Sequence, residues 1–125
     1  MVLNILAVSI GAAFGALLRW FTGLLLNQAP TWFPLGTLVV NWVGAYLIGL
    51  AAGFLGNSAL PTQWKLFVIT GFLGGLTTFS SFSLEVVQML QTQRYAAAFS
   101  TVSLHVFGSL LLTIAGLATV SMLRG

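Results

Sequence analysis

The segment from Gly71 to Glu85 carries the densest set of residues that could handle an ion. Phe79 and Phe82 are three positions apart, so they share one face of a helix. A neighbouring line on the same helix is polar and consists of Thr78, Ser81 and Glu85. A stripe of hydroxyls beside an aromatic pair could strip and replace the water of a small ion. The same spacing also fits ordinary packing, in which each hydroxyl bonds to its own helix.

Polar residues elsewhere in the chain could extend this stripe. A ladder with a spacing of four residues runs along an otherwise apolar segment and consists of Thr101, His105, Ser109 and Thr113. Asn41 lies within a hydrophobic run, where its amide needs partners. Arg19 lies near the end of the first such run and has two possible roles. It either reaches the membrane interface as an anchor or supplies a field that draws anions toward a vestibule.

The small set of reactive residues argues against an enzyme. Catalysis needs a nucleophile with a base, a metal cluster or a pair of carboxylates, whereas this chain has one His, one acid and no Cys. Glu85 and His105 both lie away from the middle of their hydrophobic runs, which favours passive conduction over coupling to protons. The four Lys and Arg residues are scattered, so no nucleic-acid partner is expected.

The composition requires these residues to be positioned by membrane helices. Because 58% of the residues are hydrophobic and only 4% are charged, we expect an all-α integral membrane protein embedded in a lipid bilayer. It is predicted to be one domain, residues 1–125, with transmembrane helices at about 2–26, 35–55, 64–90 and 95–123. Each exceeds the roughly 20 apolar residues that span a bilayer. Interfacial aromatics are expected near the span ends at Trp20, Trp32, Trp64 and Tyr95, with Trp42 somewhat inside.

The third helix is predicted to be broken near Gly74-Thr78, because two adjacent glycines weaken a helix. Irregular polar backbone inside a bilayer is tolerated only where it is buried in protein or lines an aqueous path. A break also frees carbonyl groups that can ligate a cation. Two further motifs, Gly11-x-x-x-Gly15 and Gly49-x-x-x-Gly53, allow neighbouring helix backbones to approach closely.

The distribution of positive charge bears on assembly. With both termini on one side of the membrane, Lys65 and Arg124 fall on that side, while Arg19 and Arg94 fall toward the other. This balance leaves almost no positive-inside bias, which normally sets orientation. We therefore predict dual topology and an antiparallel homodimer. The alternative is that so small a number of charges carries no information.

Two motifs in this chain closely resemble the Fluc (CrcB) family of bacterial fluoride channels. They are Gly36-Thr-Leu-Val-Val-Asn41-x-x-Gly44 and Gly71-Phe-Leu-Gly-Gly-Leu-Thr-Thr-Phe-Ser-Ser-Phe-Ser-Leu-Glu85. The pattern Gly11-x-x-x-Gly15-x-x-x-Arg19 also matches the first span of that family. Ser81 stands where a threonine is usual. Since the hydroxyl is kept and only a methyl is lost, a tuned rate is expected rather than lost function.

The resemblance implies a passive channel that exports fluoride across the bacterial cytoplasmic (inner) membrane. It implies an antiparallel dual-topology homodimer with two pores, each built from both subunits. The implied pore residues are Asn41, Thr78, Phe79, Ser81 and Phe82, with a polar track of His105, Ser109 and Thr113 and with Arg19 in a vestibule. A central structural Na⁺ is implied at the dimer interface, held by the backbone carbonyls of Gly74 and Thr77 from each subunit.

Two other classes of membrane protein fit parts of the sequence. A small multidrug-resistance-type proton-coupled exporter also has four spans and can adopt dual topology. That family relies on a glutamate within its first span, and residues 2–26 contain no acid. A structural or holin-like membrane protein is the third class, and it should show no ion selectivity.

Overall fold

The computed structural model describes residues 1–28 and 34–125, and its elements within those ranges are all helical. Within these ranges, four helices are long and apolar enough to cross a membrane: Val2–Leu26, Leu35–Leu55, Thr62–Gln91 and Tyr95–Arg124. The prediction of an all-α protein with four membrane-capable helices is confirmed. The third begins two residues earlier than expected, and the Ala29-Pro30 turn and Trp32 lie outside the described residues.

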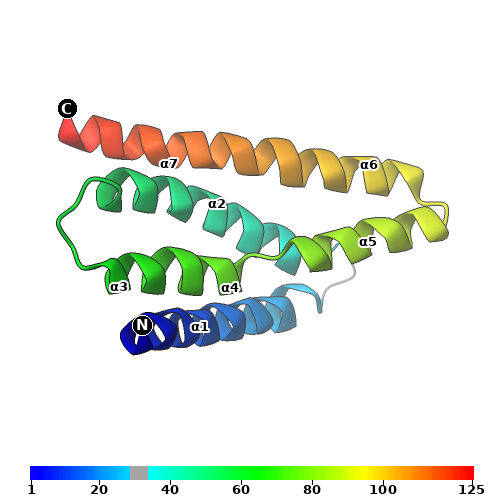
Figure 1. The fold of residues 1–125 in the computed structure, drawn as a ribbon. Helices are drawn as coiled ribbons and strands as arrows, with labels where there is room; N and C mark the ends of the chain where they lie inside the picture. The colour runs from blue at the N-terminus through cyan, green and yellow to red at the C-terminus, as the bar shows by residue number, and fades with distance from the viewer. Residues whose placement is uncertain (29–33) are drawn as a thin grey trace.

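The spans form a bundle whose two ends are distinct (Figure 1). The first two spans are single helices, α1 (Val2–Leu26) and α2 (Leu35–Leu55). The third is divided into α3 (Thr62–Lys65), the π-helical segment η1 (Leu66–Leu73), α4 (Gly74–Leu76) and α5 (Phe79–Gln91). The fourth comprises α6 (Tyr95–Ser103), the π-helical segment η2 (Leu104–Gly108) and α7 (Ser109–Arg124). Both termini lie at the end of the bundle that holds the α2–α3 turn, and the α5–α6 turn lies at the opposite end.

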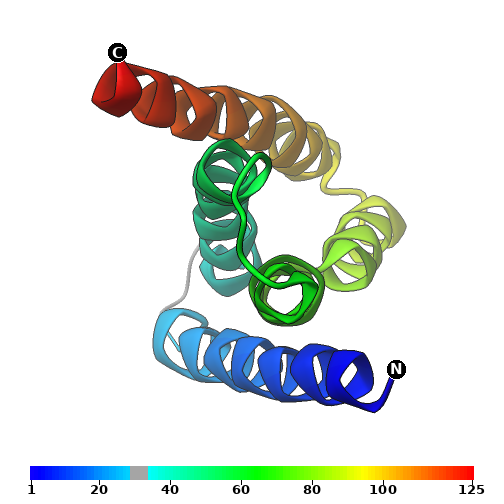
Figure 2. The ribbon, with the colours of Figure 1, turned by 60° about the vertical axis from the view of Figure 1, so that its left-hand side comes forward.

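Glycines let the helix backbones touch. α1 packs along η1 and α4, while α2 packs along α7 (Figure 2). A Cβ atom added at Gly15 would run into the carbonyl oxygen of Phe72, and one at Gly75 would lie 2.6 Å from that of Ala12. Between α2 and α7, a Cβ at Gly49 would lie 2.9 Å from the Cα of Gly116. Such close backbone packing stabilises helix pairs in lipid, where the hydrophobic effect cannot drive them together.

Replacing Gly15 with alanine should destabilise the protein by about 1–3 kcal/mol, the usual cost of overpacking a tight contact. The added methyl group meets backbone, which cannot rotate away. Gly23→Ala on the same helix is the matched control, because its Cβ would meet only the Asn27 side chain at 3.6 Å. That substitution should be neutral or stabilising, since alanine favours helix. Thermal unfolding in detergent that ranked the two variants equally would contradict the packing role of Gly15.

The break in the third span lies at Thr77 and Thr78. Both residues have extended backbone, with ψ of 157° at Thr77 and φ of −150° at Thr78. The prediction of a broken third helix near Gly74-Thr78 is confirmed, but its stated cause is wrong, because Gly74 and Gly75 are helical. The glycine at position 75 instead makes room for α1. The Thr78 hydroxyl accepts a hydrogen bond from the Ser81 amide at 3.1 Å and so caps the start of α5.

The aromatic residues expected at the membrane interface fall into two groups. Trp20, Trp64 and Tyr95 are exposed and lie toward span ends. Trp42 is half-buried and its indole nitrogen donates to the carbonyl oxygen of Leu104 at 3.0 Å. Trp42 therefore belongs to the packing between α2 and the fourth span.

Candidate functional site

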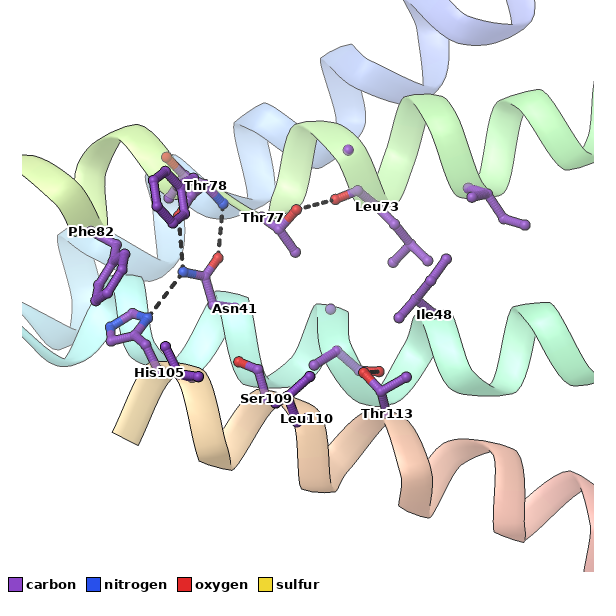
Figure 3. A pocket seen from close by; sticks show the side chains of 16 residues that line it. Asn41, Ile48, Leu73, Thr77, Thr78, Phe82, His105, Ser109, Leu110 and Thr113 are labelled. Carbon is purple, nitrogen blue, oxygen red and sulfur yellow. Dashed lines mark hydrogen bonds between the residues drawn. The ribbon is translucent and has the colours of Figure 1, made fainter. Parts of the chain in front are cut away.

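A cavity of about 570 Å³ opens between α2, the broken third span and the fourth span (Figure 3). The structure brings most of the predicted site residues together in its lining: Asn41, Gly74, Thr77, Thr78, Phe79, Phe82, His105, Ser109 and Thr113. The remaining lining residues of the described chain are apolar side chains and glycine, and none carries a formal charge. The cavity is thus lined mainly by apolar side chains and glycine, with polar groups contributed by α2, the third span and the fourth span.

Asn41 clamps the break from the facing helix. Its Oδ1 accepts from the Thr78 amide at 2.8 Å, and its Nδ2 donates to the Thr78 carbonyl oxygen at 2.9 Å (Figure 3). Both bonds substitute for helical backbone bonds that the extended residues cannot make. The side-chain amide of Asn41, which lies inside a hydrophobic span, is therefore hydrogen-bonded to the backbone of the third span.

This clamp also fixes the hydrogen-bonding state of His105. The Thr78 amide can only donate, so the Asn41 oxygen must face it, and Nδ2 must face His105 Nδ1 at 3.2 Å. Nδ1 therefore accepts, and the neutral imidazole carries its proton on Nε2. His105 is 5% exposed, and its Nε2 has no hydrogen-bond partner within the described residues. The site thus contains one buried N–H donor that is not committed to the protein.

The two phenylalanines of α5 differ in their surroundings. Phe82 is buried and lies against the His105 ring, with centroids 4.3 Å apart and planes inclined at 31°. Phe79 meets Phe82 edge to face at 5.5 Å and is 78% exposed. Phe82 is therefore held by its neighbours, whereas Phe79 projects from the open side of the cavity.

The break leaves the carbonyl groups of residues 74–77 without the amide donors that a continuous helix would supply. In an α-helix each carbonyl bonds the amide four residues ahead. In a continuous helix the Thr78 amide would donate to the Gly74 carbonyl oxygen, but here it donates to Asn41 Oδ1. Likewise, the Ser81 amide would donate to the Thr77 carbonyl oxygen in a continuous helix, but here it donates to the Thr78 hydroxyl. The Gly75 carbonyl oxygen accepts from Arg19 Nε, so the carbonyl oxygens of Gly74, Leu76 and Thr77 are the ones within the described residues that can accept a new partner at the break.

A second cavity, of about 410 Å³, lies between α1, the start of α2 and α5. Arg19, Ser81 and Glu85 line it, and Thr78 lines both cavities. Arg19 donates from Nε to the carbonyl oxygen of Gly75 at 3.0 Å, so the guanidinium is bonded at the end of α4. Arg19 is thus held against the third span while it lines the second cavity.

Comparison with known proteins decides the family. Residues 6–117 match the family model described as "CrcB-like protein, Camphor Resistance (CrcB)". The chain belongs to the CrcB family. It is 56% identical over 124 residues, 98% of its length and 95% of the relative's, to a protein of Albidiferax ferrireducens named "Fluoride-specific ion channel FluC". Relatives with the same name occur in Tolumonas auensis, at 50% identity over 99% of the chain and 98% of the relative, and Pseudomonas aeruginosa, at 49% over 98% and 97%.

The resemblance to this family seen in the sequence is thereby confirmed. The hydrogen bond from the Thr37 hydroxyl to Glu85 Oε2 at 2.6 Å is one of the contacts that the sequence did not predict. The other carboxylate oxygen of Glu85 is buried and has no hydrogen-bond partner in the described ranges. A signal was present, because Thr37 precedes Asn41 by four residues and so lies on the same face of α2.

Proposed function

We propose that this chain is a fluoride-selective passive ion channel. The observation that carries the proposal is the composition of the larger cavity, which combines an amide, hydroxyls, an imidazole N–H and two phenylalanine rings without a charged side chain. Weak donors of this kind can replace part of an anion's hydration without trapping it, as conduction requires. The relatives quoted above are named as channels and not as enzymes, in line with the expectation from the sequence.

In the proposed pathway, the anion meets ring edges and neutral donors in turn. An aromatic edge carries the positive part of the ring quadrupole, so Phe79 and Phe82 can face an anion edge-on. His105 adds its Nε2–H, and Ser109 adds a hydroxyl. The Thr113 hydroxyl donates to the Ala45 carbonyl oxygen at 2.9 Å. To serve the polar track, it must exchange that bond for one to the ion.

The second cavity is proposed as the vestibule of this pathway. Its basic residue Arg19 offers the field that attracts an anion, and Ser81 offers a hydroxyl. Thr78 is shared by both cavities and is therefore the proposed junction between vestibule and pore. Export in this scheme needs no coupling ion, because fluoride leaves the bacterial cytoplasm across the inner membrane down its own gradient.

The proposed assembly is an antiparallel dual-topology homodimer with two pores. Phe79 projects from the open side of the larger cavity, and the carbonyls of Gly74 and Thr77 lack helical donors. Backbone carbonyl groups without hydrogen-bond donors are costly in lipid, so this face needs to be covered by protein. A second copy, inverted, supplies this cover, and the two-against-two division of positive charges permits both orientations.

Reporter fusions to the C-terminus should give comparable signals from both sides of the membrane. The fusion partners would be one protein active only in the cytoplasm and one active only outside it. Arg124→Ala and Arg94→Ala remove one charge from opposite ends of the bundle and should bias the signals in opposite directions. A C-terminus found on a single side in the unaltered chain would contradict dual topology.

The carbonyls of Gly74 and Thr77 are also proposed to hold a central Na⁺ between the subunits. Hard carbonyl oxygens released at a helix break suit such a cation, and two from each subunit make a four-oxygen site. Each chain alone offers only half of it, so the ion should stabilise the dimer. The melting temperature of the purified dimer should fall when Na⁺ is replaced by N-methylglucamine, and an unchanged value would count against a sodium site.

The test of function is ion efflux from liposomes that carry the purified protein. Fluoride and chloride are loaded together, and the release of each is followed with its own electrode. A potassium ionophore starts the release, because it dissipates the membrane potential that anion efflux would otherwise build up. Rapid fluoride release with little chloride release is the expected result. If neither anion moves through folded dimers, the proposal fails, and exchange of organic cations against protons becomes the next measurement.

A further inference from the structure

Trp42 contacts the fourth span at two points that enclose His105. Its indole nitrogen donates to the carbonyl oxygen of Leu104 at 3.0 Å. A Cβ atom added at Gly108 would lie 2.6 Å from that nitrogen and 2.7 Å from the ring carbon Cε2. Leu104 and Gly108 are the first and last residues of η2. One indole therefore holds both ends of the segment that carries His105.

The geometry of η2 decides where His105 points. In a π-helix, backbone bonds reach one residue further than in an α-helix, which makes the turn wider and shifts the direction of its side chains. Such turns are rare inside α-helices, so contacts at their ends bear directly on the direction of the side chains they carry. The indole hydrogen bond at Leu104 and the glycine-sized space at Gly108 are contacts of this kind.

Consecutive residues of α2 thus contact the histidine side chain and the helical turn that carries it. Asn41 bonds the imidazole at Nδ1, and Trp42 holds the backbone turn beneath it. We propose that Trp42 is a positioning residue, which keeps η2 in the register that places His105 Nδ1 against Asn41 and thereby keeps the Nε2–H donor in the pore. The consequence for conduction rests on the proposed fluoride-channel function, whereas the consequence for the histidine does not.

The chain contains a single histidine, so imidazole NMR signals can be attributed to His105 without further resonance assignment. Protein labelled with ¹⁵N-histidine gives one pair of imidazole signals in liposomes. For the unaltered chain, these signals should report protonated Nε2 and unprotonated Nδ1. Trp42→Phe removes the indole N–H and keeps an aromatic ring, while Gly108→Ala displaces the indole from the opposite side. Both variants should lose the single tautomer and give a mixture.

Fluoride efflux through both variants should fall about fivefold, the effect of losing one net hydrogen bond. Trp64→Phe is the matched control, because Trp64 is 57% exposed near the start of the third span. It should change neither the imidazole signals nor the efflux rate. Size-exclusion chromatography and melting temperature establish that each variant is a folded dimer before it is compared.

The two readouts separate the possible failures. Imidazole signals that stay unchanged in both folded variants overturn the positioning role, whatever happens to efflux. Altered signals with undiminished efflux overturn the link between His105 geometry and conduction. If the unaltered protein moves no fluoride, the proposed function fails, and the imidazole signals alone still decide whether Trp42 positions His105.

Discussion

Replacing Asn41 with aspartate should slow fluoride efflux about a thousandfold, because a fixed charge about 4 Å from the ion repels it by about 4 kcal/mol at an effective dielectric constant near 20. The substitution also removes the Nδ2 donor. The new carboxylate oxygen would then face the Thr78 carbonyl oxygen, with which it cannot form a hydrogen bond. Asn41→Asp therefore loses the hydrogen bond to the Thr78 carbonyl oxygen and also places a negative charge in the cavity.

Two further variants separate these effects. Asn41→Ser removes the clamp without adding charge, so its efflux should lie between those of the unaltered chain and Asn41→Asp. Asn57→Asp makes the same change of charge in the exposed turn after α2 and should leave efflux unchanged. Efflux of Asn41→Asp equal to that of Asn57→Asp would show that Asn41 does not line the path.

Phe79→Ile and Phe82→Ile should each reduce fluoride efflux by at least about tenfold, which corresponds to losing about 1.5 kcal/mol of ring-edge interaction at the barrier. Isoleucine keeps an apolar side chain but has no quadrupole. Phe82→Ile also removes the ring that lies against His105 at 4.3 Å. It should therefore lower the melting temperature, whereas Phe79→Ile should leave the stability of a single chain nearly unchanged.

The chain offers a matched control for each ring. Phe99 on α6 is 76% exposed, close to the 78% of Phe79, and lies outside both cavities. Phe72 packs against the buried cluster around Leu76, also outside both cavities, and matches the packing loss of Phe82→Ile. Isoleucine at either control position should retain efflux. Undiminished efflux in Phe79→Ile and Phe82→Ile would remove the rings from the mechanism.

The helices were predictable because the bilayer restricts what a chain of this composition can do. Long apolar runs must satisfy their backbone internally, which leaves the helix as the available structure. The cause of the helix break was not predictable from propensity. Thr78 can leave the helix because Asn41 bonds both of its backbone groups and its own hydroxyl caps the start of α5. Gly75 stays helical, with α1 packed on it.

The site was predictable where polar residues repeat with the helix period. Thr78, His105 and Ser109 were identified in this way, and they line one cavity. Hydrogen bonds between different spans, in contrast, produce no periodic pattern in the sequence. The indole of Trp42 on Leu104 and the guanidinium of Arg19 on Gly75 join residues that are 62 and 56 positions apart. Only the packing of the bundle places these partners together.

Both termini lie at the same end of the bundle (Figure 1), and this limits how two copies could be joined into one polypeptide. A short linker from Gly125 to a second Met1 would place the tandem copies in the same orientation and so prevent the proposed antiparallel pairing. A linker that itself crosses the bilayer, about 20 apolar residues long, would invert the second copy. Under the proposed antiparallel pairing, a single-chain channel with independently mutable halves therefore requires a ninth span.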